Sequence, residues 1–167
     1  MHSEYRFLLD KANNDRSVGA IVVSGEGDSF CVGGDSQALQ GHSARGSYDS
    51  GVSSDIASPG YGIDERFDAT FAYHFGLNKP IIAAINGAAA GVGLALAAFA
   101  DIRFAVPKAK LTTAHGKLNL PAEYGLSWVL PRIVGLGRAN DLLLTSRVFL
   151  SEEAEKIGFV NQLFSSE

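Results

Sequence analysis

The 167-residue sequence is short of several residue types, and each shortage excludes a class of protein. It holds a single cysteine, Cys31, so it has no disulfide framework and suits a reducing, cytoplasmic setting. Its 14 basic residues are outnumbered by 18 acidic ones and form no cluster, which argues against nucleic acid as a main partner. The histidines have no metal-ligand spacing, so we predict no metal site.

Uninterrupted hydrophobic runs of membrane-spanning length are also missing. Residues 81–100 are apolar, but Asn86 and several glycines divide them into a strand and a helix. Charged side chains at Glu4, Arg6, Asp10 and Lys11 are unlike a signal peptide. We therefore expect no membrane partner.

What the sequence does contain is a strand and helix pattern with a good apolar core. Hydrophobic residues make up 46% of the chain, which favours one domain over residues 1–167. Buried strands are predicted at 18–23 and 79–85, and a strand pair follows Arg103. Alternating strands and helices indicate an α/β fold with parallel strands.

Several helices and one loop follow from the same patterns. Tyr5, Leu8, Leu9 and Ala12 predict an amphipathic helix, and Ser151 is predicted to cap a short C-terminal helix. Further helices are predicted to include Glu123 and residues 138–145, and the Gly/Ser-rich segment 40–62 to be a mobile loop. Residues 63–75 resume helical spacing, with an apolar stripe of Phe67, Phe71 and Phe75.

Two glycine turns present backbone amides. In residues 78–103 (NKPIIAAINGAAAGVGLALAAFADIR), a strand ends at Asn86-Gly87 and a helix begins near Gly91. Free N–H groups at a helix N-terminus can hold a phosphate or an oxyanion. Upstream, Gly33-Gly34-Asp35 follows another strand, and paired glycines let a backbone approach a ligand closely.

These two turns, in this order and spacing, resemble the enoyl-CoA hydratase/isomerase (crotonase) family, and the resemblance covers nearly the whole chain. It implies a crotonase-like spiral of ββα units, with the family's first strands and C-terminal helices expected outside this chain. The matching residues are Phe30-Cys31-Val32-Gly33-Gly34-Asp35, the stretch from Lys79 to Arg103, Leu130-Pro131-Arg132-Ile133-Val134-Gly135 and residues 154–160.

The resemblance also implies a site. Its oxyanion hole would be the backbone N–H groups of Gly34 and Val92, which would stabilise the enolate of a thioester. No cofactor would be bound permanently, coenzyme A entering as part of the acyl-CoA substrate, and the protein would be a homo-oligomer, a trimer or dimer of trimers. Substrate and CoA contacts would come from Val32, Gly33, Asp35, Ser36, Gly91 and Trp128.

The catalytic side chains depart from the family's two-glutamate hydratases. Ala95 and His115 occupy the matching positions, so that mechanism is not expected. Glu123 lies near the place where some isomerases of the family carry one acid/base, and we predict that an apolar pocket beside Trp128 and Leu120 raises its pKa. A first-turn helix glutamate is the alternative for Glu123. His115 is a second acid/base candidate.

Two other functions stay open. The absent carboxylate at Ala95 favours a non-catalytic or truncated acyl-CoA-binding paralogue. The spacing of Gly87, Gly91 and Gly93 (GxxxGxG) is also that of NAD(P)-dependent oxidoreductases. Against the latter, the turn does not follow the first strand, no Tyr-x-x-x-Lys pair occurs, and Asp101 comes before its strand.

Overall fold

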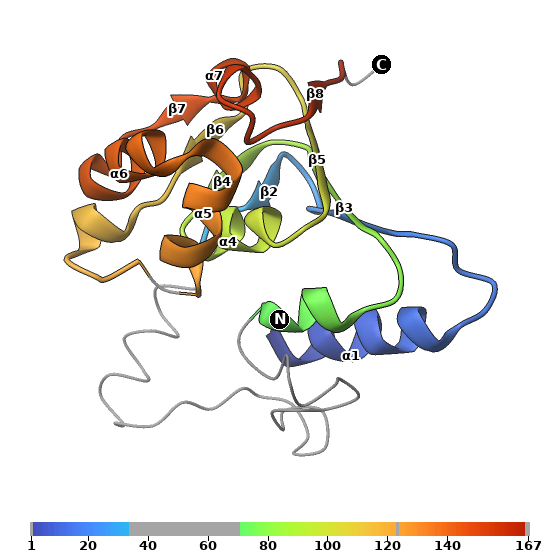
Figure 1. Cartoon of the computed structure of the whole chain (residues 1–167). Helices are drawn as coiled ribbons and strands as arrows, with labels where there is room; N and C mark the ends of the chain where they lie inside the picture. The colour runs from blue at the N-terminus through green and yellow to red at the C-terminus, as the bar shows by residue number, and fades with distance from the viewer. Residues whose placement is uncertain (1, 34–70, 123, 166–167) are drawn as a thin grey trace.

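The computed structural model describes residues 2–33, 71–122 and 124–165, which build two four-stranded sheets (Figure 1). The first sheet has the order β1-β3-β5-β8 and is parallel throughout. The second has the order β2-β4-β6-β7, in which only the β6–β7 pair is antiparallel. The first sheet comprises β1 (Ile21–Ser24), β3 (Ile81–Ile85), β5 (Ile102–Ala105) and β8 (Gln162–Leu163), and the second β2 (Ser29–Cys31), β4 (Ala88–Ala90), β6 (Lys110–Thr112) and β7 (Phe149–Leu150).

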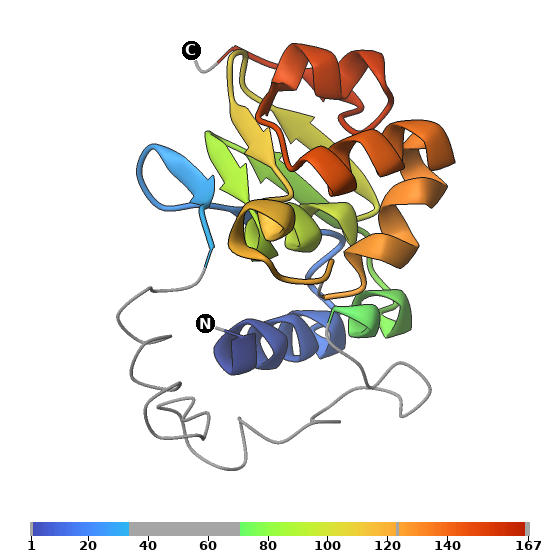
Figure 2. The same ribbon diagram turned by 90° about the vertical axis from the view of Figure 1, so that its left-hand side faces the viewer.

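Helices lie at both ends of the molecule. The N-terminal helix α1 (His2–Asn14) and the 3-10 helix η2 (Ala72–Gly76) lie side by side at one end (Figures 1 and 2). The helices α6 (Leu136–Thr145) and α7 (Ser151–Lys156) lie at the other end. None of the described helices is both long and apolar enough to cross a membrane. The helices are α1 (His2–Asn14), η2 (Ala72–Gly76), α4 (Val92–Ala98), η3 (His115–Leu118), α5 (Leu126–Val134), α6 (Leu136–Thr145) and α7 (Ser151–Lys156).

The chain supplies one strand to each sheet in turn and then a helical segment. β3, β4 and α4 form one such unit, and β5, β6 and η3 begin the next. Burial alternates along β3, so one face of the first sheet packs on the core. The predicted α/β class, its parallel strands and its ββα repeat are confirmed.

The Asn86-Gly87 corner between the two sheets interlocks with the corner before it. The Asn86 side-chain oxygen accepts from the Gly25 N–H at 3.0 Å, and its Nδ2 donates to the Gly25 and Gly27 carbonyls at 3.0 and 2.8 Å. A Cβ at Gly87 would lie 2.0 Å from the Asp28 carbonyl oxygen. The two corners therefore fit only because residue 87 has no side chain.

Helix α4 lies directly on the backbone of β2. A Cβ at Gly93 would lie 2.0 Å from the Cys31 carbonyl oxygen and 2.7 Å from the Cys31 Cβ. Small and aliphatic side chains of α4, among them Leu94, Ala95 and Ala97, are fully buried. Glycine thus brings the helix N-terminus against the end of β2.

Some predicted elements differ from the structure. Residues 88–90 form β4, a strand that the sequence analysis missed because three alanines carry little strand preference and the pairing with β2 and β6 imposes it. The predicted helix at the N-terminus is confirmed as α1, but Leu8 lies outside its buried stripe and is exposed. β1 begins three residues later than predicted, at Ile21.

The predicted Ser151 cap and the predicted phenylalanine stripe both differ from the structure. Ser151 is not the cap of α7 but its first residue, and its hydroxyl instead donates to the Val106 carbonyl at 2.8 Å and accepts from the Ala109 N–H at 3.1 Å. Phe71 is buried, whereas Phe75 is exposed, because residues 72–76 form a 3-10 helix that turns the stripe. Phe67 and the predicted loop 40–62 lie outside the described residues.

A buried histidine joins α1 to the rest of the core. His74 Nδ1 donates to the Phe99 carbonyl at 3.1 Å, which leaves Nε2 to accept from the Tyr5 hydroxyl at 3.1 Å. Burial lowers the pKa of His74 to about 4, against the smaller raising effects of the Phe99 bond and Asp101. His74 is therefore neutral at pH 7 and belongs to the core rather than to a reactive site.

Replacing Gly93 with alanine should separate α4 from β2. The new Cβ would overlap a backbone carbonyl, which cannot swing away, so we expect the free energy of unfolding to drop by about 3 kcal/mol or more. Gly137→Ala in α6 is the matched control, because nothing lies within 4 Å of a Cβ there and alanine should gain up to about 1 kcal/mol. Urea unfolding measures both, and equal stabilities would contradict the packing described.

His74 should make the fold sensitive to acid. The unfolded imidazole titrates near 6.5 and the folded one near 4, so the unfolded chain binds the extra proton between these values. His74 therefore stabilises the fold fully above pH 6.5, and about 2 to 3 kcal/mol is lost as the pH falls to 4. Urea unfolding of wild type and His74→Phe from pH 7 to 4 tests this. The difference in free energy of unfolding between wild type and His74→Phe should become smaller as the pH falls. A difference that stays constant from pH 7 to 4 would contradict the prediction.

Candidate functional site

Three turns meet at the carboxyl edge of the second sheet. β2, β4 and β6 are parallel and paired at Cys31 with Ala89, Ala89 with Leu111 and Ala90 with Thr112. The residues that follow the three strands therefore lie side by side. Ligands of α/β proteins commonly bind outside the carboxyl ends of parallel strands, which makes this edge the candidate site.

Two of the predicted glycines line this edge in conformations that favour glycine. Gly33 has φ +110° and Gly91 φ +54°. A Cβ at Gly33 would lie 4.0 Å from the Ala90 carbonyl oxygen, and one at Gly91 would lie 4.0 Å from the Ala114 Cβ. The turn after β2 thus adjoins β4, and the turn after β4 adjoins the turn after β6.

The start of α4 presents backbone amides at this edge. The Gly91 N–H donates to the Thr112 carbonyl at 3.1 Å, and the Ala95 N–H makes the first bond of the helix, to the Gly91 carbonyl, at 3.1 Å. The amides of Val92, Gly93 and Leu94 precede that first helical bond. Val92 carries a buried side chain, and its amide lies where the helix dipole is positive.

His115 begins η3 and is buried. Its N–H donates to the Thr113 carbonyl at 2.8 Å, closing a tight turn at Ala114, whose φ is +62°. Its carbonyl accepts from the Leu120 N–H at 3.0 Å. His115 therefore follows Ala114, the neighbour of Gly91, and lies on the same edge as the Val92 amide.

Four of the predicted site residues have no described position. Gly34, Asp35, Ser36 and Glu123 lie outside the described residues. Helix α5 begins at Leu126, and the two residues before it, Tyr124 and Gly125, both have positive φ. The acid/base role of Glu123 and its alternative as a first-turn helix glutamate both stay predictions.

Trp128 and Leu120, the residues predicted to form an apolar pocket beside Glu123, are exposed, at 49% and 46%. The pocket itself stays a prediction, because Glu123 lies outside the described residues. The Trp128 ring instead packs with the Arg132 guanidinium, 3.9 Å from the ring centroid, and meets the Phe75 ring edge-on at 5.9 Å. Val32, another predicted substrate contact, is exposed.

Sequence reasoning missed the residues that hold the His115 turn. The Thr112 hydroxyl donates to the Ser146 carbonyl at 3.1 Å, and the Thr113 hydroxyl donates to the Leu142 carbonyl at 2.9 Å. The Ser146 hydroxyl oxygen accepts from the Gly116 N–H at 2.8 Å. No spacing signal joins Ser146 to residues 30 and more positions away, so only the fold reveals this contact.

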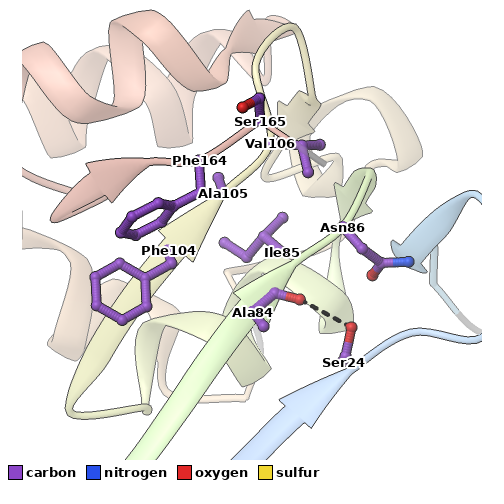
Figure 3. A pocket seen from close by; sticks show the side chains of 9 residues that line it. All are labelled: Ser24, Ala84, Ile85, Asn86, Phe104, Ala105, Val106, Phe164 and Ser165. Atoms are coloured by element: carbon purple, nitrogen blue, oxygen red, sulfur yellow. Dashed lines mark hydrogen bonds between the residues drawn. The ribbon is translucent and has the colours of Figure 1, made fainter. Parts of the chain in front are cut away.

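A cavity of about 270 Å³ opens elsewhere, at the carboxyl ends of the first sheet (Figure 3). Ile85, Ala105 and Phe164 give it an apolar lining, and Asn86 stands at its rim beside Ser24 and Ala84 (Figure 3). Asn86 precedes β4 whereas Gly91 follows it, so the strand separates this cavity from the candidate site.

Neither a metal centre nor a dinucleotide turn emerges from the described residues. No three His, Cys, Asp or Glu side chains within residues 2–33, 71–122 and 124–165 are grouped to hold a metal ion. The GxxxGxG stretch is split by β4, with Gly87 before the strand and Gly91 after it. Asp101 accepts from the Ile81 N–H at 2.8 Å and so ties β3 to β5.

Comparison with known proteins agrees with this geometry. The sequence matches the enoyl-CoA hydratase/isomerase family over residues 1–167. It is 32% identical to 1,2-epoxyphenylacetyl-CoA isomerase of Escherichia coli (strain K12), over 100% of this chain and 60% of that protein. It is also 32% identical to crotonyl-CoA hydratase of Syntrophomonas wolfei, over 98% of this chain and 58% of that protein.

Solved structures extend the match to three dimensions. The enoyl-CoA hydratase/isomerase from Cupriavidus metallidurans CH34 superposes with a TM-score of 0.76 at 28% identity, covering 99% of this chain and 58% of that one. The chain thus spans 60% or less of the length of these relatives. With the family matched throughout and the fold shared, the chain belongs to the enoyl-CoA hydratase/isomerase family and has its crotonase fold.

Proposed function

We propose that this chain transfers protons on the acyl group of an enoyl-CoA, hydrating or isomerising its double bond through a thioester enolate. The observation that carries the proposal is the meeting of three turns at the carboxyl edge of β2, β4 and β6, where the Val92 amide begins α4. The names of the relatives favour the same chemistry, since one is an acyl-CoA isomerase and another a hydratase.

In this proposal the enolate oxygen accepts from the amides of Val92 and Gly34. When a proton leaves C2 or C4 of the acyl group, the electron pair moves onto the thioester oxygen. Two fixed donors at that oxygen stabilise the charge by a few kcal/mol each. Gly93 fixes the start of α4 against β2, so the Val92 donor is already in place before the substrate arrives.

A single acid/base suffices for isomerisation. The Glu123 carboxylate takes a proton from C2 or C4 and returns it to the other carbon, and no atom is gained or lost. Ala95 supports this assignment, because α4 offers only a fully buried methyl group where the two-glutamate hydratases would have a carboxylate. Hydration instead adds hydroxide at C3 and a proton at C2, and His115 is the proposed group that holds the water.

The substrate class and assembly are part of the same proposal. Acyl-CoA is the only small-molecule partner proposed, with no permanently bound cofactor. We also propose a homo-oligomer, since Leu136 and Leu144 on α6 expose large apolar side chains.

Heavy water gives the first test. Purified protein is incubated with 2-enoyl- and 3-enoyl-CoA esters in D2O and followed by liquid chromatography and mass spectrometry. Isomerisation shifts the retention time and introduces deuterium, and hydration adds the mass of water. A folded protein that neither converts nor exchanges any ester would exclude the catalytic proposal. If such a protein still bound acyl-CoA saturably, it would be an acyl-CoA-binding paralogue without catalytic activity. The absence of a carboxylate at Ala95 favours this alternative.

Side-chain variants assign the proton transfers. Glu123→Gln should lower kcat for isomerisation by about 10² to 10⁴-fold, because the amide cannot take the proton. His115→Gln should lower hydration more than isomerisation. Glu26→Gln, an exposed glutamate in the turn between β1 and β2, is the control and should leave both rates unchanged. Full turnover by Glu123→Gln would refute its role.

A further inference from the structure

Ser146 stands behind the candidate site in an unusual conformation. It follows the last residue of α6 and has φ +46° and ψ +33°, the left-handed region that is unfavourable for a residue with a Cβ. Its side chain is fully buried. Glycine would fit this backbone without strain, so the serine hydroxyl must supply something that glycine lacks.

What the hydroxyl supplies is a set of hydrogen bonds around His115. The Ser146 oxygen accepts from the Gly116 N–H at 2.8 Å. The Thr113 hydroxyl lies 2.9 Å from the Leu142 carbonyl and 3.2 Å from the Ser146 hydroxyl oxygen, and it can donate to either. The Ser146 hydroxyl itself donates to the Leu143 carbonyl at 3.4 Å. The residues on either side of the Ala114-His115 pair are therefore both fastened to the same serine.

The backbone of Ser146 completes the attachment. Its carbonyl accepts from the Thr112 hydroxyl at 3.1 Å, and the Thr112 oxygen in turn accepts from the Ala114 N–H at 3.1 Å. A Cβ at Gly116 would lie 2.9 Å from the Ser146 oxygen, which shows how closely the two segments approach. Residues 112–116 thus rest on the C-terminal end of α6.

We propose that Ser146 is a positioning residue, whose hydroxyl sets the place of the His115 imidazole relative to the Val92 amide. This rests on the proposed function, in which His115 acts at the acyl group. A group that handles a proton must be held near its productive geometry, and a shift of about 1 Å can cost as much as 100-fold in rate.

Two substitutions separate positioning from stability. Ser146→Gly removes the hydroxyl and also the left-handed strain, whereas Ser146→Ala removes the hydroxyl and keeps the strain. Positioning predicts that both lower kcat for hydration by about 10- to 100-fold with KM changed less than about threefold, although only the alanine variant is clearly less stable. A kcat that follows stability across the two variants, with the glycine variant fully active, overturns the proposal.

The control is another buried serine with two backbone partners. Ser151→Ala loses the bonds to the Val106 carbonyl and the Ala109 N–H. These bonds lie before the start of β6, whereas His115 follows its end. It should lower stability and leave kcat unchanged. A double variant adds a second test, because Ser146→Gly should cost nothing further in a His115→Gln background. An additive loss would show that Ser146 acts independently of His115.

A spectroscopic readout keeps this inference apart from the proposed function. The His115 imidazole signal is assigned by its disappearance in His115→Gln, and we expect its chemical shift to move in Ser146→Gly but not in Ser151→Ala. An unmoved signal overturns the positioning role. If wild type converts no enoyl-CoA, the proposed function falls and takes the catalytic purpose of Ser146 with it, whereas normal conversion by Ser146→Gly removes this inference alone.

Discussion

The structure depends on a contact between two backbones that leaves no room for a side chain. At Gly93, helix α4 lies on the Cys31 carbonyl of β2, and at Gly87 the corner before β4 lies on the Asp28 carbonyl. The two contacts flank β4, one at the corner before it and one at the helix start after it, and bring both against β2 and the residue before β2. Glycine at residue 93 therefore allows the start of α4 to pack directly on the backbone of β2. The start of α4 is also where the proposed enolate donor lies.

The two sheets differ in how they are held and in what lies at their edges. The first is tied together by polar side chains at strand ends, where Asp101 bonds the Ile81 N–H and the Arg103 Nε donates to the Phe159 carbonyl at 2.6 Å. Such bonds add about 1.5 to 3 kcal/mol each, because one partner is charged, and they favour this order of neighbouring strands. The second sheet has short strands, and the turns at Gly33, Gly91 and Ala114 adjoin one another at its carboxyl edge.

The sequence predicts those elements whose structure is set by their own residues, and misses those set by contacts with distant segments. β3 and α4 were predicted because their residues alone carry the apolar pattern and the breaks, and the glycine turns followed from the need for close backbone approach. β4 could not be predicted, because its alanines become a strand only through their neighbours. The exposure of Trp128 and the contact of Ser146 with Gly116 have the same origin, since both are set by packing between distant segments. The family motif located the edge of the site, but not what supports it.

The site is asymmetric in a way that bears on its chemistry. On one side, the proposed enolate donor is the backbone amide of Val92, at the start of a helix that Gly93 packs against β2. Helix α4 contains no Asp or Glu, and Ala95, at the position of the hydratase carboxylate, is fully buried. In the proposed function, proton transfer comes from the segment after β6, which begins at the His115 turn held by Ser146. A fixed amide can serve any thioester, whereas the reaction that follows depends on where the acid/base stands. Differences between hydration and isomerisation in this fold should therefore arise from residues after β6 and from the contacts, such as that of Ser146, which hold them.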